Sequence, residues 1–231
     1  KERQAAAAAG WRAPRRAAFA VATAVAGDQV AFTNSPWSFS REAVRQALGL
    51  EALAVVNDFE ALALSLPGLA LSQWRPLGGP PLAERADAPV GTLLAVLGPG
   101  TGLGVGAVIR ARAGWQAIPG EGGHATLAAT DALEAEVIAV VRREQGHVSA
   151  ERLLAGPGLP LLLAALAAVQ GRVPAVDPTP EAIVAAALDG GDALALDTLD
   201  LFARLLGSFA GNLALTMGAR GGVFVGGGVV P

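Results

Sequence analysis

The chain has 231 residues, of which 52% are hydrophobic and 16% charged, and its formal net charge is −3. This composition can supply one large core or two smaller ones, and it argues against nucleic acid as a partner. The chain has no cysteine, which excludes disulfides and thiolate metal sites and fits a cytoplasmic protein. Its most apolar run, residues 159–169, is shorter than the ~20 residues that span a bilayer, so we expect no membrane segment.

Residues 1–68 alternate between predicted strands and helices and form a predicted small α/β domain. The predicted elements are a helix at 1–9, strands at 17–26 and 29–33 joined as a hairpin at Gly27-Asp28, a helix from the N-cap Ser40 to Gly49, a strand at 53–56 and a helix at 58–66. A stretch rich in proline and glycine follows at residues 73–90 and predicts a domain boundary.

Residues 69–231 form a predicted large α/β domain, in which strands come first and helices follow. The predicted elements are strands at 92–97, 103–109 and 115–118, helices at 131–143, 149–155, 159–170, 179–188 and 192–217, and a strand at 222–225. Gly207 and Gly211 lie within the longest helix, and we expect another element to approach closely there.

The run Gly98-Pro99-Gly100-Thr101-Gly102-Leu103-Gly104 has more glycine than a simple turn needs. A dinucleotide-binding motif requires a helix directly after the glycines, whereas residues 105–109 read as a strand. A P-loop lysine is also absent from this run. The motif therefore predicts a strand–turn–strand hairpin whose N–H groups and Thr101 hydroxyl could hold phosphate, with a purely structural hairpin as the alternative.

Asn57-Asp58 follows an apolar strand and precedes a helix. An aspartate in that place is most simply an N-cap. A carboxylate at the carboxyl end of a strand is also well placed to act as a general base.

Glu121-Gly122-Gly123-His124 has the spacing of helical metal ligands, but the two glycines argue against a helix and we expect no metal site. We instead expect a rigid loop that presents a carboxylate and an imidazole to sugar hydroxyls. Glu151 follows Ser149 at a predicted helix start, where alone it reads as structural. Glu121 and Glu151 are expected to lie away from the glycine-rich turn.

A base, a phosphate cradle and a hydroxyl clamp together suggest phosphoryl transfer to a sugar. Taken as a set, the motifs resemble bacterial glucokinases of the hexokinase superfamily, which have the two-domain actin-like ATPase (ribonuclease H-like) fold. The resemblance rests on motifs spread over nearly the whole chain: Thr33-Asn34, Val56-Asn57-Asp58-Phe59, residues 98–104, Pro119-Gly120-Glu121-Gly122-Gly123-His124, residues 146–152, Gly156-Pro157-Gly158-Leu159, Gly211-Asn212-Leu213-Ala214-Leu215 and residues 221–228.

The resemblance implies ATP-dependent phosphorylation of glucose at its 6-hydroxyl, with Mg²⁺ and with Asp58 as the catalytic base. It further implies three groups of binding residues: Asn57, Glu121, His124 and Glu151 for glucose; Gly100, Thr101 and Gly102 for the phosphates; and Gly226, Gly227 and Gly228 near the adenosine. It also implies a cytoplasmic enzyme of glycolysis that forms a homodimer. Mannose and other hexoses, and ADP or polyphosphate as donor, fit the same residues.

One family motif, the Asp-x-Gly-Gly-Thr phosphate loop, does not occur in this sequence. We therefore expect the fold to be incomplete at both ends, and the segment alone to be inactive and poorly soluble, with the strand at 17–26 exposing an open edge. A non-catalytic sugar-binding or regulatory module on the same fold is the alternative. A nicotinamide-dependent oxidoreductase is disfavoured because a strand follows the glycines.

Overall fold

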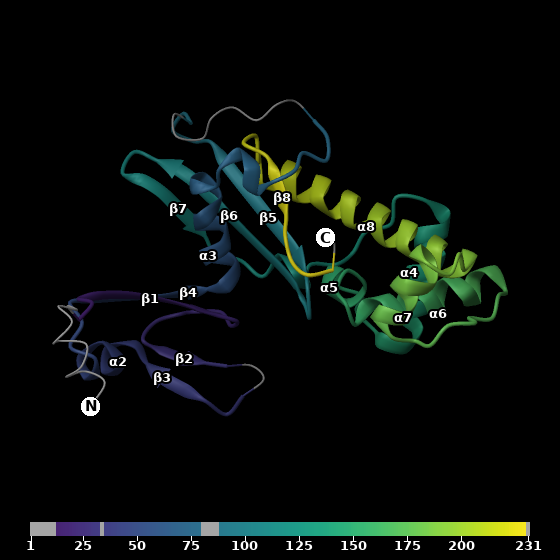
Figure 1. The fold of residues 1–231 in the computed structure, drawn as a ribbon, viewed down its shortest axis with the longest axis horizontal. Coiled ribbons are helices and arrows are strands. Elements are labelled where there is room, and N and C mark those ends of the chain that lie inside the picture. Colours follow the sequence, from purple (N-terminus) through teal and green to yellow (C-terminus); the bar gives the residue numbers. More distant parts are fainter. Residues whose placement is uncertain (1–12, 33–34, 80–87, 230–231) are drawn as a thin grey trace. The chain divides into compact units, whose positions relative to one another are not determined.

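The computed structural model describes residues 13–32, 35–79 and 88–229 (Figure 1). Contacts divide the chain into two compact units, Lys1–Ala61 and Leu62–Pro231, which we call the small unit and the large unit. The predicted helix at residues 1–9 and the family motif Thr33-Asn34 lie outside the described residues. The domain division at residue 68 stays a prediction of the sequence.

The small unit contains two separate pairs of strands. Strand β1 (Arg16–Val21) pairs in parallel with β4 (Ala52–Asn57), and β2 (Gln29–Ala31) pairs antiparallel with β3 (Ser38–Ser40). The predicted hairpin between residues 17–26 and 29–33 is therefore wrong. The chain leaves the first strand at Val21, and the Thr23 hydroxyl then donates a hydrogen bond to the main-chain oxygen of Ala31 in place of a strand ladder.

Helices α2 and α3 begin where the sequence predicts. Helix α2 (Arg41–Ala47) has Ser40 as its N-cap, and the Ser40 hydroxyl accepts from the N–H of Ala43. Helix α3 (Asp58–Ser65) follows β4 without an intervening loop and continues into the 3₁₀ turns η1 (Leu66–Gly68) and η2 (Leu71–Gln73). The polar residues at the end of β4 are therefore also the first residues of a helix.

The large unit is built on a four-stranded sheet with the order β7-β6-β5-β8. Strands β5 (Leu93–Pro99) and β6 (Leu103–Ala111) form the predicted antiparallel hairpin, and β7 (Gly114–Ile118) extends it. Strand β5 is buried along its whole length. Strand β8 (Val223–Val225) pairs with it in parallel, although the whole helical part of the unit separates the two in sequence.

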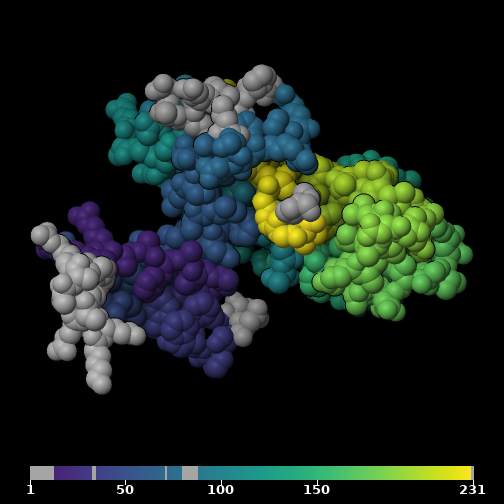
Figure 2. Space-filling view, viewed as in Figure 1, coloured from purple at the N-terminus to yellow at the C-terminus, as the bar shows by residue number. Residues whose placement is uncertain are grey.

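Helices of the large unit pack around one hydrophobic core, and they are drawn in green to yellow in Figure 2. They are α4 (Ala132–Gln145), α5 (Ala150–Leu153), α6 (Gly158–Gln170), α7 (Pro180–Leu188) and α8 (Ala193–Met217), preceded by the 3₁₀ turn η3 (Gly122–His124). Four of these helices begin directly after a residue that caps them with its side chain: Asp131, Ser149, Thr179 and Asp192. The predicted close approach at Gly207 and Gly211 is wrong for the described part of the chain, because a Cβ at either position would meet none of its atoms within 4 Å.

A buried carboxylate ties α4 to α8. Glu134 is only 1% exposed, and its Oε2 accepts hydrogen bonds from the N–H and hydroxyl of Thr130 at 2.6 and 2.7 Å. Arg204 of α8 forms ion pairs with Asp131 and, at 3.4 Å, with Glu134. No helix of the described part of the chain is both long and apolar enough to cross a membrane.

Candidate active site

The turn between β5 and β6 is the point on which several glycine-containing segments converge. Within the turn, the N–H of Gly100 donates to the main-chain oxygen of Gly102 at 2.8 Å. From outside, the N–H of Gly156 donates to the Gly100 oxygen at 2.8 Å, and that of Val229 to the Pro99 oxygen at 3.2 Å. The turn is therefore held by segments from two distant parts of the chain.

Glu151 reaches the same turn from α5. Ser149 caps this helix by accepting from the N–H of Arg152, so Glu151 lies in its first turn. The Glu151 Oε2 atom accepts a hydrogen bond from the N–H of Leu103 at 2.9 Å. A Cβ added to Gly102 would lie 2.5 Å from that oxygen. The expectation that Glu151 lies away from the glycine-rich turn is therefore wrong.

The loop that contains Glu121 and His124 also packs on the hairpin, as the short 3₁₀ turn η3 rather than as an irregular loop. Its two glycines are required by close approach, since a Cβ on Gly123 would lie 2.0 Å from the Leu103 oxygen and one on Gly122 would lie 2.9 Å from a Val105 methyl carbon. A larger residue at either position would force η3 away from β6.

Main-chain bonds fix the position of η3 relative to α5. The N–H of Ala150 donates to the oxygen of Ala125 at 2.8 Å, and the Thr126 hydroxyl lies 2.9 Å from the Nε2 atom of the second histidine, His147. As a result, His124 Nδ1 lies 3.8 Å from Glu151 Oε1. The imidazole and the carboxylate that the sequence assigns to one ligand are brought together.

These groups line a hollow of about 280 Å³ in the large unit. Its walls come from the turn, η3, α5 and the start of α6: Thr101, His124, Ser149, Glu151, Arg152, Ala155, Pro157, Gly158 and Leu161. Three of the sequence-predicted site residues are among them, whereas Glu121 is not. The sequence does not indicate that Arg152 lines this hollow, because an arginine one residue after Glu151 in a helical run is typical of an ordinary solvated charge.

The glycine triplet after β8 packs against the other side of the turn. Gly227 has a φ of +89°, and a Cβ there would lie 2.3 Å from the Pro99 oxygen. The N–H of Gly226 donates to the Leu97 oxygen at 2.9 Å, whereas a Cβ on Gly228 would meet no atom of the described residues within 4 Å. Gly227 thus has a structural reason to be glycine, and the adenosine role of the triplet stays a prediction.

In the small unit, Asn57 and Asp58 share one main-chain donor. The N–H of Phe59 lies 2.8 Å from the Asn57 Oδ1 atom and 2.9 Å from the Asp58 Oδ1 atom. Asn57 precedes the first helical residue and therefore occupies the N-cap position that the sequence offered to Asp58. Asp58 is exposed and forms no ion pair with another described residue, so the rest of its carboxylate can face a ligand.

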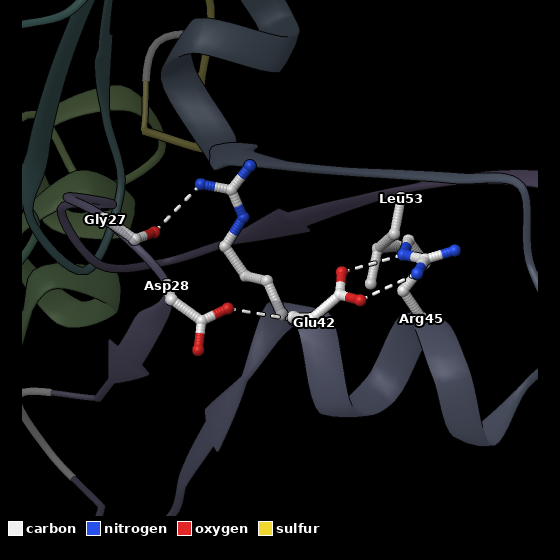
Figure 3. Close-up of a pocket in the computed structure, with 6 residues that line it drawn as sticks. Gly27, Asp28, Glu42, Arg45 and Leu53 are labelled. Carbon is white, nitrogen blue, oxygen red and sulfur yellow. Dashed lines mark hydrogen bonds and ion pairs between the residues drawn. The ribbon is translucent and has the colours of Figure 1, made fainter.

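A second hollow, of about 260 Å³, lies in the small unit, lined by Gly27, Asp28, Arg41, Glu42, Arg45 and Leu53 (Figure 3). Arg41 donates to the Gly27 oxygen at 2.9 Å, and the N–H of Glu42 donates to Asp28 at 2.9 Å. Hydrogen bonds from Arg45, and next from Gln46, lower the pKa of Glu42 from 4.5 to about 2. The charged side chains here bind one another and tie the start of β2 to α2.

The architecture is that of the actin-like ATPase class, with a turn, a carboxylate and an imidazole gathered at one sheet end. The chain belongs to the glucokinase family, whose model matches residues 2–231. It is 49% identical to the glucokinase of Chromobacterium violaceum over 96% of this chain and 62% of that protein. It is 46% identical to the glucokinase of Paramagnetospirillum magneticum over 96% of this chain and 68% of that protein.

Solved structures agree with this assignment. The crystal structure of a glucokinase from an Antarctic psychrotroph is 36% identical, covers all of this chain and 69% of that one, and gives a TM-score of 0.86. A glucokinase from Balamuthia mandrillaris, crystallised with glucose, covers 91% of this chain and 63% of that one, and shares the fold at 20% identity with a TM-score of 0.69. The chain spans under two thirds of the length of the Chromobacterium violaceum relative. The resemblance to bacterial glucokinases that the motifs indicate is confirmed.

Proposed function

We propose that this protein transfers the γ-phosphoryl group of ATP to the 6-hydroxyl of glucose. The observation that carries the proposal is the single hollow in which Thr101 of the glycine-rich turn, His124 and Glu151 come together. The relatives that are 46% and 49% identical are named glucokinases, which supports the same activity here.

The sugar is proposed to bind through Glu121, His124 and Glu151 of the large unit and Asn57 of the small unit. Carboxylates accept hydrogen bonds from sugar hydroxyls, whereas an amide N–H donates to them, so this set can satisfy both functions of a hydroxyl. Each buried hydroxyl left without its partner would cost about 1–3 kcal/mol, which lets such a set discriminate between hexoses.

The phosphates are proposed to bind at the β5–β6 turn. The N–H of Gly100 already donates to the Gly102 oxygen, and that of Leu103 donates to Glu151. The N–H groups of Thr101 and Gly102 have no acceptor among the described residues, so they are the turn's proposed donors for a phosphate oxygen, together with the Thr101 hydroxyl. These donors fit a phosphate group. The N–H of Gly100 is already used within the turn, so Gly100 is proposed to contribute through the conformation of its backbone.

Asp58 is proposed to accept the proton of the 6-hydroxyl as the oxygen–phosphorus bond forms and the bond to the leaving ADP breaks. Phosphoryl transfer depends mainly on positioning and charge neutralisation, and a carboxylate receives the hydroxyl proton. Mg²⁺ neutralises phosphate charge when it is bound. No three His, Asp or Glu side chains of the described residues gather into a metal site.

A coupled assay of the full-length protein tests the proposal, with glucose, mannose and other hexoses as acceptors and with ATP, ADP and polyphosphate as donors. Turnover that requires glucose and ATP is the expected result. Calorimetric titration with glucose, ATP and NAD separates the alternatives: glucose binding without turnover would favour a non-catalytic sugar-binding module, and NAD binding an oxidoreductase. A cytoplasmic location and a homodimer stay predictions.

A further inference from the structure

Two glycines of the β5–β6 turn differ in what surrounds them. Among the described residues, a Cβ on Gly100 would meet one atom, the Gly102 oxygen at 3.9 Å, which is an ordinary contact. A Cβ on Gly102 would lie 2.5 Å from the Glu151 Oε2 atom and 3.3 Å from its carboxyl carbon. Neither glycine has a positive φ. Gly102 is therefore required for space, and its backbone conformation would accept a side chain.

The carboxylate of Glu151 fills this space, and each of its two oxygens lies near another group. Glu151 Oε2 accepts from the N–H of Leu103 at 2.9 Å, and Oε1 lies 3.8 Å from His124 Nδ1. The side chain of Glu151 is about one third exposed, so the carboxylate still faces the hollow. Its position depends on the turn on one side and on η3 on the other.

We propose that Gly102 is a positioning residue for the sugar-binding carboxylate, in addition to supplying an N–H to the phosphate site. The absent side chain leaves the space in which the Glu151 carboxylate reaches Leu103 and faces His124. The proposal rests on the proposed function and adds that a residue of the phosphate turn sets the affinity for the sugar.

A methyl group at Gly102 would displace the carboxylate and leave the fold intact. The clashing atoms are the far end of a flexible side chain, which can rotate away at little cost to the unit's stability. We therefore expect Gly102→Ala to change the thermal unfolding midpoint only slightly while weakening sugar binding. A purely structural role would produce the opposite pattern.

Calorimetric titration of the full-length protein with glucose, in the absence of nucleotide, tests this separation. We expect Gly102→Ala to raise the dissociation constant for glucose by about tenfold or more, in the range of a directly coupled pair. The matched control is Gly207→Ala in α8, outside the proposed site, which should stay within about twofold of the wild-type dissociation constant because its Cβ would meet none of the described residues within 4 Å.

A double-mutant cycle identifies Glu151 as the mediator. In a Glu151→Ala background the clash is gone, so adding Gly102→Ala should weaken glucose binding no further. Equal affinities of the wild type and Gly102→Ala, or effects that add fully in the double variant, would overturn the inference alone. A wild-type protein that binds no glucose would instead overturn the proposed function, and the sugar role of Gly102 with it.

Discussion

The side-chain amide of Asn57 donates a hydrogen bond to the main-chain oxygen of Thr23, 3.3 Å away. The oxygen of the same amide accepts from the N–H of Phe59 at 2.8 Å. Because both ends of the amide are engaged, its orientation is fixed and one N–H remains to donate to a ligand. Thr23 is itself buried, and its hydroxyl holds it to Ala31 of β2 at 2.9 Å.

This arrangement predicts that Thr23→Val raises the KM for glucose. The isosteric change removes the hydroxyl that anchors the Thr23 peptide, and through that peptide it loosens Asn57. We expect a rise of about three- to tenfold, the equivalent of the ~1 kcal/mol of one hydrogen bond, with kcat nearly unchanged. Thr23→Ser keeps the hydroxyl and should restore the wild-type KM. Equal KM values in wild type and Thr23→Val would show that Asn57 is positioned without Thr23.

The proposed base is tested by Asp58→Asn. The amide still accepts from the N–H of Phe59 but receives no proton, so kcat should fall by ~10²-fold or more while glucose binding persists. Asp28→Asn is a matched control, since Asp28 likewise accepts a main-chain N–H beside a helix start, from Glu42. It should leave kcat unchanged. Retention of more than about a tenth of wild-type turnover by Asp58→Asn would contradict the assignment.

Two carboxylates of the proposed sugar site should respond differently. Glu121 is a proposed glucose ligand, so Glu121→Gln should raise the KM for glucose. Because Glu121 does not line the hollow beside the phosphate turn, the KM for ATP should stay unchanged. Glu151→Ala also releases the N–H of Leu103 in the phosphate turn, so it should raise both KM values. Steady-state kinetics with each substrate varied would show this split. An ATP KM that rises for Glu121→Gln and stays constant for Glu151→Ala would reverse the assignments.

The buried carboxylate between α4 and α8 predicts a large loss of stability without a specific loss of binding. Glu134→Ala leaves the Thr130 N–H and hydroxyl without their acceptor and removes one partner of Arg204. The free energy of unfolding should fall by about 2 to 4 kcal/mol. Glu136→Ala, at an exposed position of the same helix, should change it by less than about 0.5 kcal/mol. Urea unfolding curves of both variants would measure the difference.

Glu42 makes the stability of the small unit depend on pH. Its pKa is lowered from 4.5 to about 2, first by the hydrogen bond from Arg45 and next by that from Gln46. A lowered pKa in the folded state means that the contribution is fully present above pH 4.5 and is lost as the pH falls toward 2. Thermal unfolding midpoints over this window should fall more steeply for the wild type than for Glu42→Gln. Parallel curves would show that the carboxylate is not stabilised in the fold.

Local signals in the sequence were sufficient for most elements. The caps Ser40, Ser149 and Thr179 use side-chain atoms only three residues from the N–H they bind, so the pattern and its geometry coincide. Strand partners are a different matter. The parallel pairing of β1 with β4 depends on the crossover through α2, and nothing within residues 17–33 favours it over a local hairpin.

The candidate site shows the same division between local and distant causes. The residue types of the turn and of η3 indicated phosphate and sugar chemistry, because each motif is read within a few residues. The contact between Gly102 and Glu151 could not be read in this way, since it depends on α5 reaching back to the hairpin from far along the chain. The glycines of the turn and of the triplet were interpreted as part of a nucleotide site, whereas Gly123 and Gly227 serve close packing.

Strand β8 has a consequence for the order in which the protein folds. Its three residues pair with β5, yet η3 and helices α4 to α8 are all synthesised between the two strands. The β5–β6 hairpin can form early from local contacts, whereas β5 keeps an unpaired edge until β8 arrives. Sequence-distant pairings of this kind slow folding and prolong the exposure of an apolar edge. The large unit should therefore need chaperones most between the emergence of β6 and that of β8.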